Sequence, residues 1–306
     1  MRPITKLPRL LRPAPSRHGS SASSERWTAR ATRDPFTKEA QLKGYKSRAA
    51  MKLIEMNQKH KLFSAGMTVV DLGYAPGSWM QVALENIAPR GRILGVDIIP
   101  ALPARGASTI QGNFTCPGVQ ASIRRFLSDP ERGRLRNSQI FRDGEAAEED
   151  VQEASRGYIE RERMLGGEAH GEGHASVDVV LSDMSEPWPI VEGMWKASLS
   201  APYRMMNTSG IRVRDHVGSI DLCNAALLFC IDVLKPGGSF VCKFYQGPED
   251  RLLRNRLDAV FERVVQDKPL ASRQESRENY FVALRRRARV DKAEVMKMPW
   301  TDEAVE

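Results

Sequence analysis

The sequence predicts an α/β protein whose mostly parallel sheet is covered by helices on both faces. Short β-branched apolar segments alternate with longer segments of helical periodicity, which is the pattern of repeated strand-helix-strand units. The first strand leads through a glycine-containing loop directly into a helix. A length of 306 residues with 41% hydrophobic content supports one substantial core, so we expect one main domain with appendages.

The elements follow from periodicity in chain order. A helix is expected over residues 47–60, where Ala50, Leu53 and Ile54 are interleaved with lysines. Strands are then predicted at Thr68–Leu72, 92–98, Ser108–Gln111 and Val177–Ser182, with helices between them. The C-terminal part adds a helix at 222–234, a Pro236-Gly237-Gly238 turn, a strand at 239–245, a helix at 250–265 and a last strand at 280–284. Because strand, helix and last strand follow closely, we expect the last strand to be antiparallel.

The predicted domain spans residues 41–288 and is interrupted at 116–176. The interruption is densely charged, is rich in glycine near its end and lacks a sustained apolar face, so we interpret it as a flexible insertion. Short helices are expected within it near 123–127 and 158–164. A small folded partner-binding module is the alternative. Residues 289–306 are expected to form a solvated tail.

The N-terminal segment has the composition of a mitochondrial transit peptide, which is rich in Arg and Ser and poor in acid. Residues 1–24 contain serines and no acidic residue, and their cations are Arg2, Lys6, Arg9, Arg12 and Arg17. We therefore expect residues 1–40 to be a transit peptide with a flexible arm, and the mature protein to be in the mitochondrial matrix. Prolines at 3, 8, 13 and 15 would interrupt an amphipathic helix, so a basic arm that contacts RNA is the alternative.

Charge and cysteine usage narrow the class of protein. The net charge of +8 and the pI of about 9.4 favour a polyanionic partner such as nucleic acid. The four cysteines form no C-x-x-C pair and the histidines are scattered, so we expect reduced thiols and no metal site. Apolar runs such as 225–231 are shorter than the roughly 18 to 20 residues of a membrane span, so we expect a soluble protein without membrane insertion.

The loop after the first strand is typical of a nucleotide site. Gly73 and Gly77 let the backbone approach a ligand, and Asp97 at the end of the next strand can accept both hydroxyls of a ribose. A dinucleotide fingerprint would read G-x-G-x-x-G, whereas Pro76 removes a donor that a pyrophosphate would use. S-adenosylmethionine, which carries a ribose and a sulfonium but no phosphate, is therefore favoured over NAD. A glycine turn without a ligand is the alternative.

Four ionisable residues occur where the chain leaves a strand or faces this loop: Lys52, Asp183, Lys243 and Glu278. The ligand crevice of a doubly wound sheet lies at the carboxyl ends of its strands, so Asp183 is expected to point into it. Burial would lower the pKa of Lys243, as a general base requires. Each residue also has an ordinary explanation as a turn former or a surface charge.

Together these residues belong to seven motifs that resemble the FtsJ family of RNA ribose 2′-O-methyltransferases over residues 43–115 and 177–286. Among family members, the chain is most similar to those that act on a uridine of mitochondrial large-subunit rRNA in fungi. In chain order the motifs are Ser47-Arg-Ala-Ala-Met-Lys-Leu53, Asp71-Leu-Gly-Tyr-Ala-Pro-Gly-Ser-Trp79, Gly95-Val-Asp97, Gln111-Gly-Asn-Phe114, Leu181-Ser-Asp-Met184, Phe240-Val-Cys-Lys-Phe-Tyr-Gln-Gly247 and Ser272-Arg-Gln-Glu-Ser-Arg-Glu-Asn-Tyr280.

The resemblance implies a seven-stranded Rossmann-like class I fold and a catalytic Lys-Asp-Lys-Glu tetrad, which falls on Lys52, Asp183, Lys243 and Glu278. In this interpretation Lys243 is the base, Lys52 lowers its pKa, Asp183 holds the ammonium and the cosubstrate, and Glu278 orients Lys52 or the ribose. No metal takes part. The cofactor-binding residues would be Gly73, Ala75, Pro76, Gly77, Trp79, Asp97, Asn113 and Asp183.

Three positions depart from the family pattern. Tyr74 and Ser78 replace small residues of the loop and are expected to reshape the methionine end of the pocket. Asn113 replaces an acid and keeps an acceptor for the adenine amino group. Asp183 is followed by Met-Ser-Glu-Pro-Trp188 instead of Met-Ala-Pro-Asn, which leaves the substrate-side loop open.

The expected partner is large-subunit rRNA or the assembling mitochondrial large subunit, bound by a monomer. Phosphate contacts are assigned to Lys43, Lys46, Arg48, Arg273 and Arg277, and Trp188 and Tyr245 are candidates to stack on a base. The main rival is an RNA-binding ribosome-assembly factor that keeps the fold without turnover. A small-molecule methyltransferase is disfavoured by the positive charge, and an oxidoreductase by Pro76.

Overall fold

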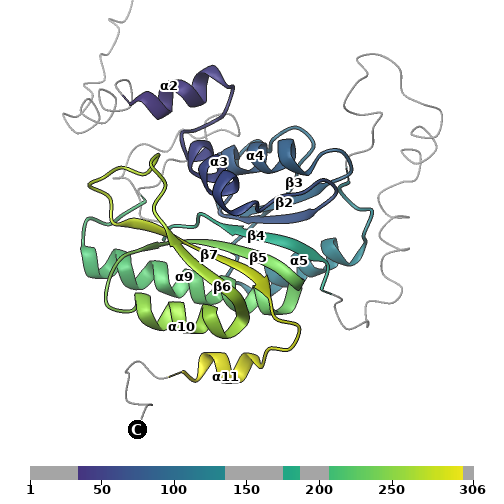
Figure 1. Ribbon diagram of the computed structural model, residues 1–306. Helices are drawn as coiled ribbons and strands as arrows, with labels where there is room; N and C mark the ends of the chain where they lie inside the picture. The colour runs from purple at the N-terminus through teal and green to yellow at the C-terminus, as the bar shows by residue number, and fades with distance from the viewer. Residues whose placement is uncertain (1–33, 135–174, 187–206, 299–306) are drawn as a thin grey trace, which may run out of the picture.

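The computed structural model describes residues 34–134, 175–186 and 207–298, which build one seven-stranded sheet (Figure 1). The sheet order is β3-β2-β1-β4-β5-β7-β6; β1 to β5 pair in parallel, and β7 runs antiparallel between β5 and β6. The strands are β1 (Thr68–Leu72), β2 (Arg92–Asp97), β3 (Ser108–Gln111), β4 (Val177–Ser182), β5 (Leu234–Tyr245), β6 (Phe261–Asp267) and β7 (Glu278–Arg286). The predicted fold class and the antiparallel last strand are confirmed.

Helices cover both faces of this sheet (Figure 1). Alternate strand residues serve the two faces, so that Val69 joins the core under α3 and α4 while Val70 joins the core under α5, α9 and α10. The described helices are α2 (Pro35–Leu42), α3 (Ala49–His60), α4 (Ser78–Ile87), α5 (Pro117–Ser128), α9 (Arg212–Val233), α10 (Asp250–Val260) and α11 (Lys292–Met296). The two cores position α3 and α9 on opposite sides of the strand ends that carry the candidate site.

Several element predictions were wrong in extent. Strand β5 starts at Leu234, five residues before the expected position 239, so the predicted Pro236-Gly237-Gly238 turn lies within this strand. The helix expected to reach residue 265 ends at Val260, and Phe261 begins β6, an edge strand that buries Phe261 and Val264 and exposes Glu262 and Arg263. Charged and apolar residues continue across this junction without a turn residue, so the sequence does not reveal where helical periodicity changes to strand periodicity. The helix expected from residue 222 starts ten residues earlier, at Arg212, although Gly218 lies within it.

Helix α9 is long and apolar enough to pass for a membrane span by length and composition alone. In the fold, however, 56% of its most apolar 18-residue window is buried inside the protein. Residues such as Ala226, Leu227 and Cys230 are fully buried against the sheet. Its hydrophobic character is therefore explained by packing in the domain core.

Ordered structure extends beyond the expected limits of 41 and 288. Asp34 caps α2 by accepting the backbone N–H of Phe36, and Ala40 is buried against the loop after β6. At the other end, Val295 of α11 is 3% exposed because it packs into the main core. The solvated tail is thus folded in its first part.

The start of the predicted insertion is also part of the fold. Helix α5 buries Ile123 and Leu127, as expected from the apolar spacing there. The guanidinium of Arg92 donates to the carbonyls of Leu127, Asp129 and Arg132, which fixes the end of this helix to β2. Residues 1–33, 135–174 and 187–206, including the helix expected at 158–164, lie outside the described residues.

Candidate active site

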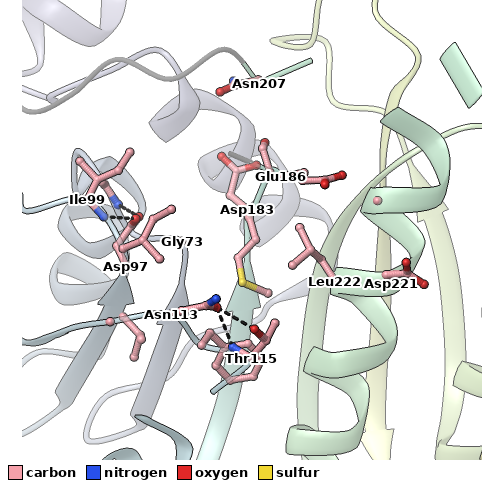
Figure 2. A pocket seen from close by; sticks show the side chains of 18 residues that line it. Gly73, Asp97, Ile99, Asn113, Thr115, Asp183, Glu186, Asn207, Asp221 and Leu222 are labelled. Carbon is pink, nitrogen blue, oxygen red and sulfur yellow. Dashed lines mark hydrogen bonds between the residues drawn. The ribbon is translucent and has the colours of Figure 1, made fainter. Parts of the chain in front are cut away.

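A cavity of about 430 Å³ lies at the carboxyl ends of β1, β2 and β4, between the glycine-containing loop after β1 and the first half of α9 (Figure 2). This is the crevice where open α/β sheets bind their ligands. Five of the predicted cofactor residues line the cavity: Gly73, Ala75, Asp97, Asn113 and Asp183.

Asp97 is held rigidly at the end of β2. Its Oδ2 accepts the backbone N–H of Ala75 at 2.8 Å, and its Oδ1 accepts the backbone N–H of Ile99 at 2.9 Å. Burial raises the pKa of Asp97, and these backbone hydrogen bonds oppose the rise by stabilising the carboxylate. The carboxylate therefore ties the glycine loop to β2 and faces the cavity, as Figure 2 shows.

Both the backbone conformation and the packing at position 73 require a glycine. Its φ is +78°, and a Cβ at this position would lie 2.9 Å from the Cα of Met184. Its N–H donates to Val96 O at 2.8 Å, which turns the chain over the end of the sheet. The glycine thus brings the loop from β1 close to the loop from β4.

Three predicted cofactor residues are not among the lining residues: Pro76, Gly77 and Trp79. Gly77, with φ +103°, is the N-cap of α4. The indole of Trp79 is 2% exposed, donates to Ala49 O at 2.8 Å and packs 5.8 Å from the ring of Tyr280. Its position gives Trp79 a packing role, because it joins α4 to the helix that carries Lys52.

The departures from the family pattern have mostly structural consequences. Tyr74 does not line the cavity: its ring packs on Gly95, and its hydroxyl donates to Ala101 O at 2.8 Å. Ser78 is 3% exposed and forms a 2.8 Å hydrogen bond with Ser47. The expectation that these two residues reshape the pocket is therefore wrong. Tyr74 connects the loop to β2, and Ser78 connects it to the segment before α3, on the side away from the cavity.

Asn113 lines the cavity, but its Oδ1 is already engaged. It accepts the backbone N–H of Thr115 at 3.0 Å and the Thr115 hydroxyl at 2.8 Å, which closes a local turn (Figure 2). The group that remains for a ligand in this conformation is the amide NH₂. Asn113 therefore offers a ligand a hydrogen-bond donor instead of the predicted acceptor. A donor suits a ring nitrogen of adenine better than the adenine amino group.

The cavity is strongly acidic. Among the described residues, its lining includes the carboxylates of Asp97, Asp183, Glu186 and Asp221 and no lysine or arginine. Behind them, Asp71 is fully buried and neither of its carboxyl oxygens has a hydrogen-bond partner among the described residues. Burial, followed by the charges of Asp183 and Asp97, raises the pKa of Asp71 well above 3.8. Such a site favours a cationic ligand and disfavours a phosphate.

The tetrad residues come together beside this cavity in two ion pairs. Lys243 is buried on β5, and its Nζ lies 3.1 Å from Asp183 Oδ1 and donates to Asp183 O and Ser185 Oγ, each at 2.7 Å. Lys52 on α3 forms a close ion pair with Glu278 on β7. All four residues thus lie at one edge of the sheet, and Asp183 connects the tetrad to the cavity.

Tyr280 joins the two ion pairs and was not assigned a role from the sequence. Its hydroxyl lies 3.0 Å from Glu278 Oε1, 3.2 Å from Lys52 Nζ and 3.3 Å from Asp183 Oδ1. Burial, then the neighbouring carboxylates, raises the pKa of Tyr280, so the hydroxyl keeps its proton. A periodicity signal could have found it: Tyr280 follows Glu278 by two residues on a strand and therefore shares its face.

The charge state of the tetrad differs from the expectation. Burial acts to lower the pKa of Lys243, but the charges of Asp183, Tyr245 and Glu278 outweigh it and the pKa is raised above 10.5. Burial likewise acts to raise the pKa of Glu278, whereas Lys52 and Lys243 lower it to about 2. The expected lowering of the Lys243 pKa is therefore wrong for the protein without ligands, because its carboxylate partner is too close.

The predicted phosphate-binding residues divide into two groups. Arg48 is tied to Asp34 and to Ala271 O, and Lys46 donates to Leu102 O, so both serve the protein itself. Arg273 and Arg277 are exposed beside the tetrad, and exposed Lys43 pairs with nearby Glu39. Tyr245 is 7% exposed and therefore unsuited to stacking on a base, and Trp188 lies outside the described residues.

The strand order, the glycine loop and the acid-lined cavity define a Rossmann-like methyltransferase fold. The chain belongs to the FtsJ-like methyltransferase family, whose model matches residues 45–286. It is 39% identical to rRNA methyltransferase 2, mitochondrial, of Saccharomyces cerevisiae, over 90% of this chain and 92% of that protein. It is 32% identical to the protein of the same name from Schizosaccharomyces pombe, over 85% and 95% of the two chains.

Solved structures agree on the fold. A ribosomal RNA methyltransferase, putative, from Plasmodium falciparum superimposes with a TM-score of 0.51 at 22% identity, covering 80% of this chain and all of that one. At this identity the likeness concerns the arrangement of strands and helices alone.

Proposed function

We propose that the protein methylates a ribose 2′-hydroxyl in mitochondrial large-subunit rRNA, with S-adenosylmethionine as the methyl donor and a uridine as the target. The observation that carries the proposal is the closed Lys52-Glu278-Tyr280-Asp183-Lys243 network at the rim of an acid-lined nucleotide cavity. The names of the fungal relatives support rRNA as the substrate and the mitochondrion as the location. We further propose that the protein acts in the matrix as a monomer and that residues 1–40 contain the targeting sequence.

The residues can divide the reaction between binding and proton transfer. Asp97 would hold the ribose hydroxyls of the donor, and Asp183 would face its cationic end. When bound, S-adenosylmethionine supplies a methyl group activated by the positive sulfonium. Lys243, once deprotonated, takes the proton from the 2′-hydroxyl as the oxygen–carbon bond forms and the carbon–sulfur bond breaks. The electron pair of the broken bond stays on sulfur, so the products are a methylated ribose and S-adenosylhomocysteine.

Positioning contributes more to this reaction than base catalysis. Holding two reactants in line is worth roughly 7–11 kcal/mol, whereas a general base supplies about 10²- to 10⁴-fold. Glu278 and Tyr280 fix Lys52 at one side of Asp183, and Ser185 and Asp183 fix Lys243 at the other. Since Glu278 compensates the charge of Lys52, we assign Lys52 to orienting the substrate instead of lowering the pKa of Lys243.

The test is methyl transfer from labelled S-adenosylmethionine to large-subunit rRNA and to assembling subunits, with the product mapped as a 2′-O-methyl ribose. Lys243→Ala should bind S-adenosylmethionine nearly as wild type does, because Lys243 is not among the residues that line the cavity, and should lose transfer by at least about 100-fold. Robust turnover by this variant would exclude Lys243 as the base.

A second candidate is an RNA-binding assembly factor that keeps the fold without turnover. The raised pKa of Lys243 favours it, since a protonated lysine cannot accept a proton. Wild-type protein that binds S-adenosylmethionine but labels neither free rRNA nor assembling subunits would support this candidate over the enzyme.

A further inference from the structure

Beyond Cys242, the strand that carries Lys243 loses its parallel neighbour. β4 ends at Ser182, opposite Cys242, whereas β5 continues to Tyr245 with β7 paired along its other edge. The backbone groups of β5 that face away from β7 in this last stretch therefore need partners from elsewhere.

Side chains of α9 provide these partners. The Cys223 thiol lies 3.1 Å from Lys243 O, the Ser219 hydroxyl accepts the N–H of Tyr245 at 3.0 Å, and His216 Nδ1 lies 2.6 Å from Tyr245 O. The helical spacing of residues 216, 219 and 223 places all three on one face of α9. These three side chains contact the backbone groups of β5 that a neighbouring strand would otherwise pair with. We name His216, Ser219 and Cys223 the α9 clasp.

His216 extends the clasp into the next loop. Its Nδ1 lies 2.6 Å from Tyr245 O and therefore carries the ring proton, while its Nε2 accepts the backbone N–H of Glu249 at 3.2 Å. Glu249 Oε2 lies 2.7 Å from Nε2 and has no hydrogen-bond partner among the described residues. The ring is 3% exposed, and Gly247 packs flat against it, since a Cβ there would lie 2.5 Å from the ring.

The clasp also reaches Glu278 through the sheet. Tyr245 pairs in register with Glu278, and the N–H of Gln246 donates to Arg277 O at 3.0 Å. Fixing the end of β5 therefore fixes the positions of Lys243 and Glu278, which each belong to one ion pair of the tetrad. The turn at residues 247–250, which His216 holds through Glu249, follows directly at the same edge of the sheet.

We propose that His216 is a positioning residue with two separable roles: through Nδ1 it holds the strand end that carries Lys243, and through Nε2, which accepts the N–H of Glu249, it holds the turn at residues 247–250. This inference rests on the proposed function. It assigns no contact with the cosubstrate, because His216 is not among the residues that line the cavity. Asp250, whose Oδ1 is 3.8 Å from Nδ1, is the other charged group that faces the ring.

Two substitutions separate the roles, because each amide reproduces one ring nitrogen. His216→Asn keeps a donor for Tyr245 O and loses the acceptor for the N–H of Glu249; kcat and the KM for RNA should both stay within about 2-fold of wild type. His216→Gln keeps an acceptor for the N–H of Glu249 and loses the bond to Tyr245 O; kcat should fall about 10-fold with a smaller change in KM. S-adenosylmethionine affinity should stay at the wild-type value in both.

Further variants keep the test valid if His216 variants fold poorly. Ser219→Ala, which removes the acceptor of the Tyr245 N–H, should reproduce the fall in kcat. Ser122→Ala, an exposed position on α5 that bonds only within its own helix, is the matched control and should leave both constants unchanged.

The outcomes separate this inference from the proposed function. A wild-type protein that methylates no RNA would refute the proposed function itself. An active wild type with His216→Asn and His216→Gln indistinguishable from each other would refute the two roles and leave His216 as a packing residue.

Discussion

Within the described part of the chain, the hydroxyl of Tyr280 is the single group outside the tetrad that contacts both of its ion pairs, so Tyr280→Phe is the most informative substitution. The change leaves the buried ring and its contact with Trp79 in place. It removes hydrogen bonds of 3.0, 3.2 and 3.3 Å to Glu278, Lys52 and Asp183. Because Tyr280 does not line the cavity, the cosubstrate should bind as in wild type.

The size of the effect follows from the charges involved. A hydrogen bond to a charged group contributes about 1.5–3 kcal/mol, and one hydroxyl with a single proton cannot satisfy all three partners fully at once. We expect a loss of about 2–3 kcal/mol from the transition state, which corresponds to about 30- to 150-fold in kcat.

The assay is single-turnover methyl transfer to rRNA together with calorimetric titration of S-adenosylmethionine. Tyr74→Phe is the matched control, because the Tyr74 hydroxyl bonds Ala101 O and the side chain of Thr109, away from the tetrad. Its loss should affect stability by about 1 kcal/mol without changing kcat. A Tyr280→Phe rate within 2-fold of wild type would refute the role of the hydroxyl. A parallel loss of cosubstrate affinity would show that the fold of the pocket had changed instead.

Three further substitutions test the site. The folded pKa of Glu278 is about 2, below its ordinary 4.5, so its stabilisation of about 3 kcal/mol is present above pH 4.5 and lost as pH falls toward 2; denaturant titrations should show this loss in wild type and not in Glu278→Gln. Gly73→Ala forces a Cβ to 2.9 Å from Met184 at φ +78° and should lower the free energy of unfolding by about 1–3 kcal/mol, and an unchanged melting curve would contradict this packing. Asp97→Asn turns an amide donor toward one backbone N–H and should weaken S-adenosylmethionine binding about 10- to 100-fold by calorimetry, whereas wild-type affinity would remove Asp97 from the ribose site.

Sequence reasoning succeeded where turn residues or charges bound a strand and failed where two elements meet without a turn between them. Thr68–Leu72, Ser108–Gln111 and Val177–Ser182 were predicted to the residue, because turn residues or charges bound each apolar run. β6 was missed because an edge strand with one buried face starts directly at the end of α10. Neither propensity nor periodicity separates two elements that share a boundary without a turn.

The candidate site shows the same limit at the level of side chains. The motifs located Lys52, Asp183, Lys243 and Glu278, but they did not show that Trp79 points into the core. A motif gives a residue's place along the chain; which side of a loop its side chain takes depends on long-range packing, such as that between α3 and α4. The His216 contact with β5 is likewise a contact between elements 29 residues apart in sequence.

The raised pKa of Lys243 has a physical resolution within the proposed reaction. Asp183 raises it from 3.1 Å away, and Asp183 is also the tetrad carboxylate that lines the cavity. A cationic cosubstrate bound beside Asp183 would share that negative charge and add a positive charge near the ammonium. Both effects lower the pKa of Lys243, and neither operates before the donor is bound. Lys243 would therefore become a competent base only in the complex, so that burial supplies the low-dielectric setting and the donor itself supplies the charge that releases the proton.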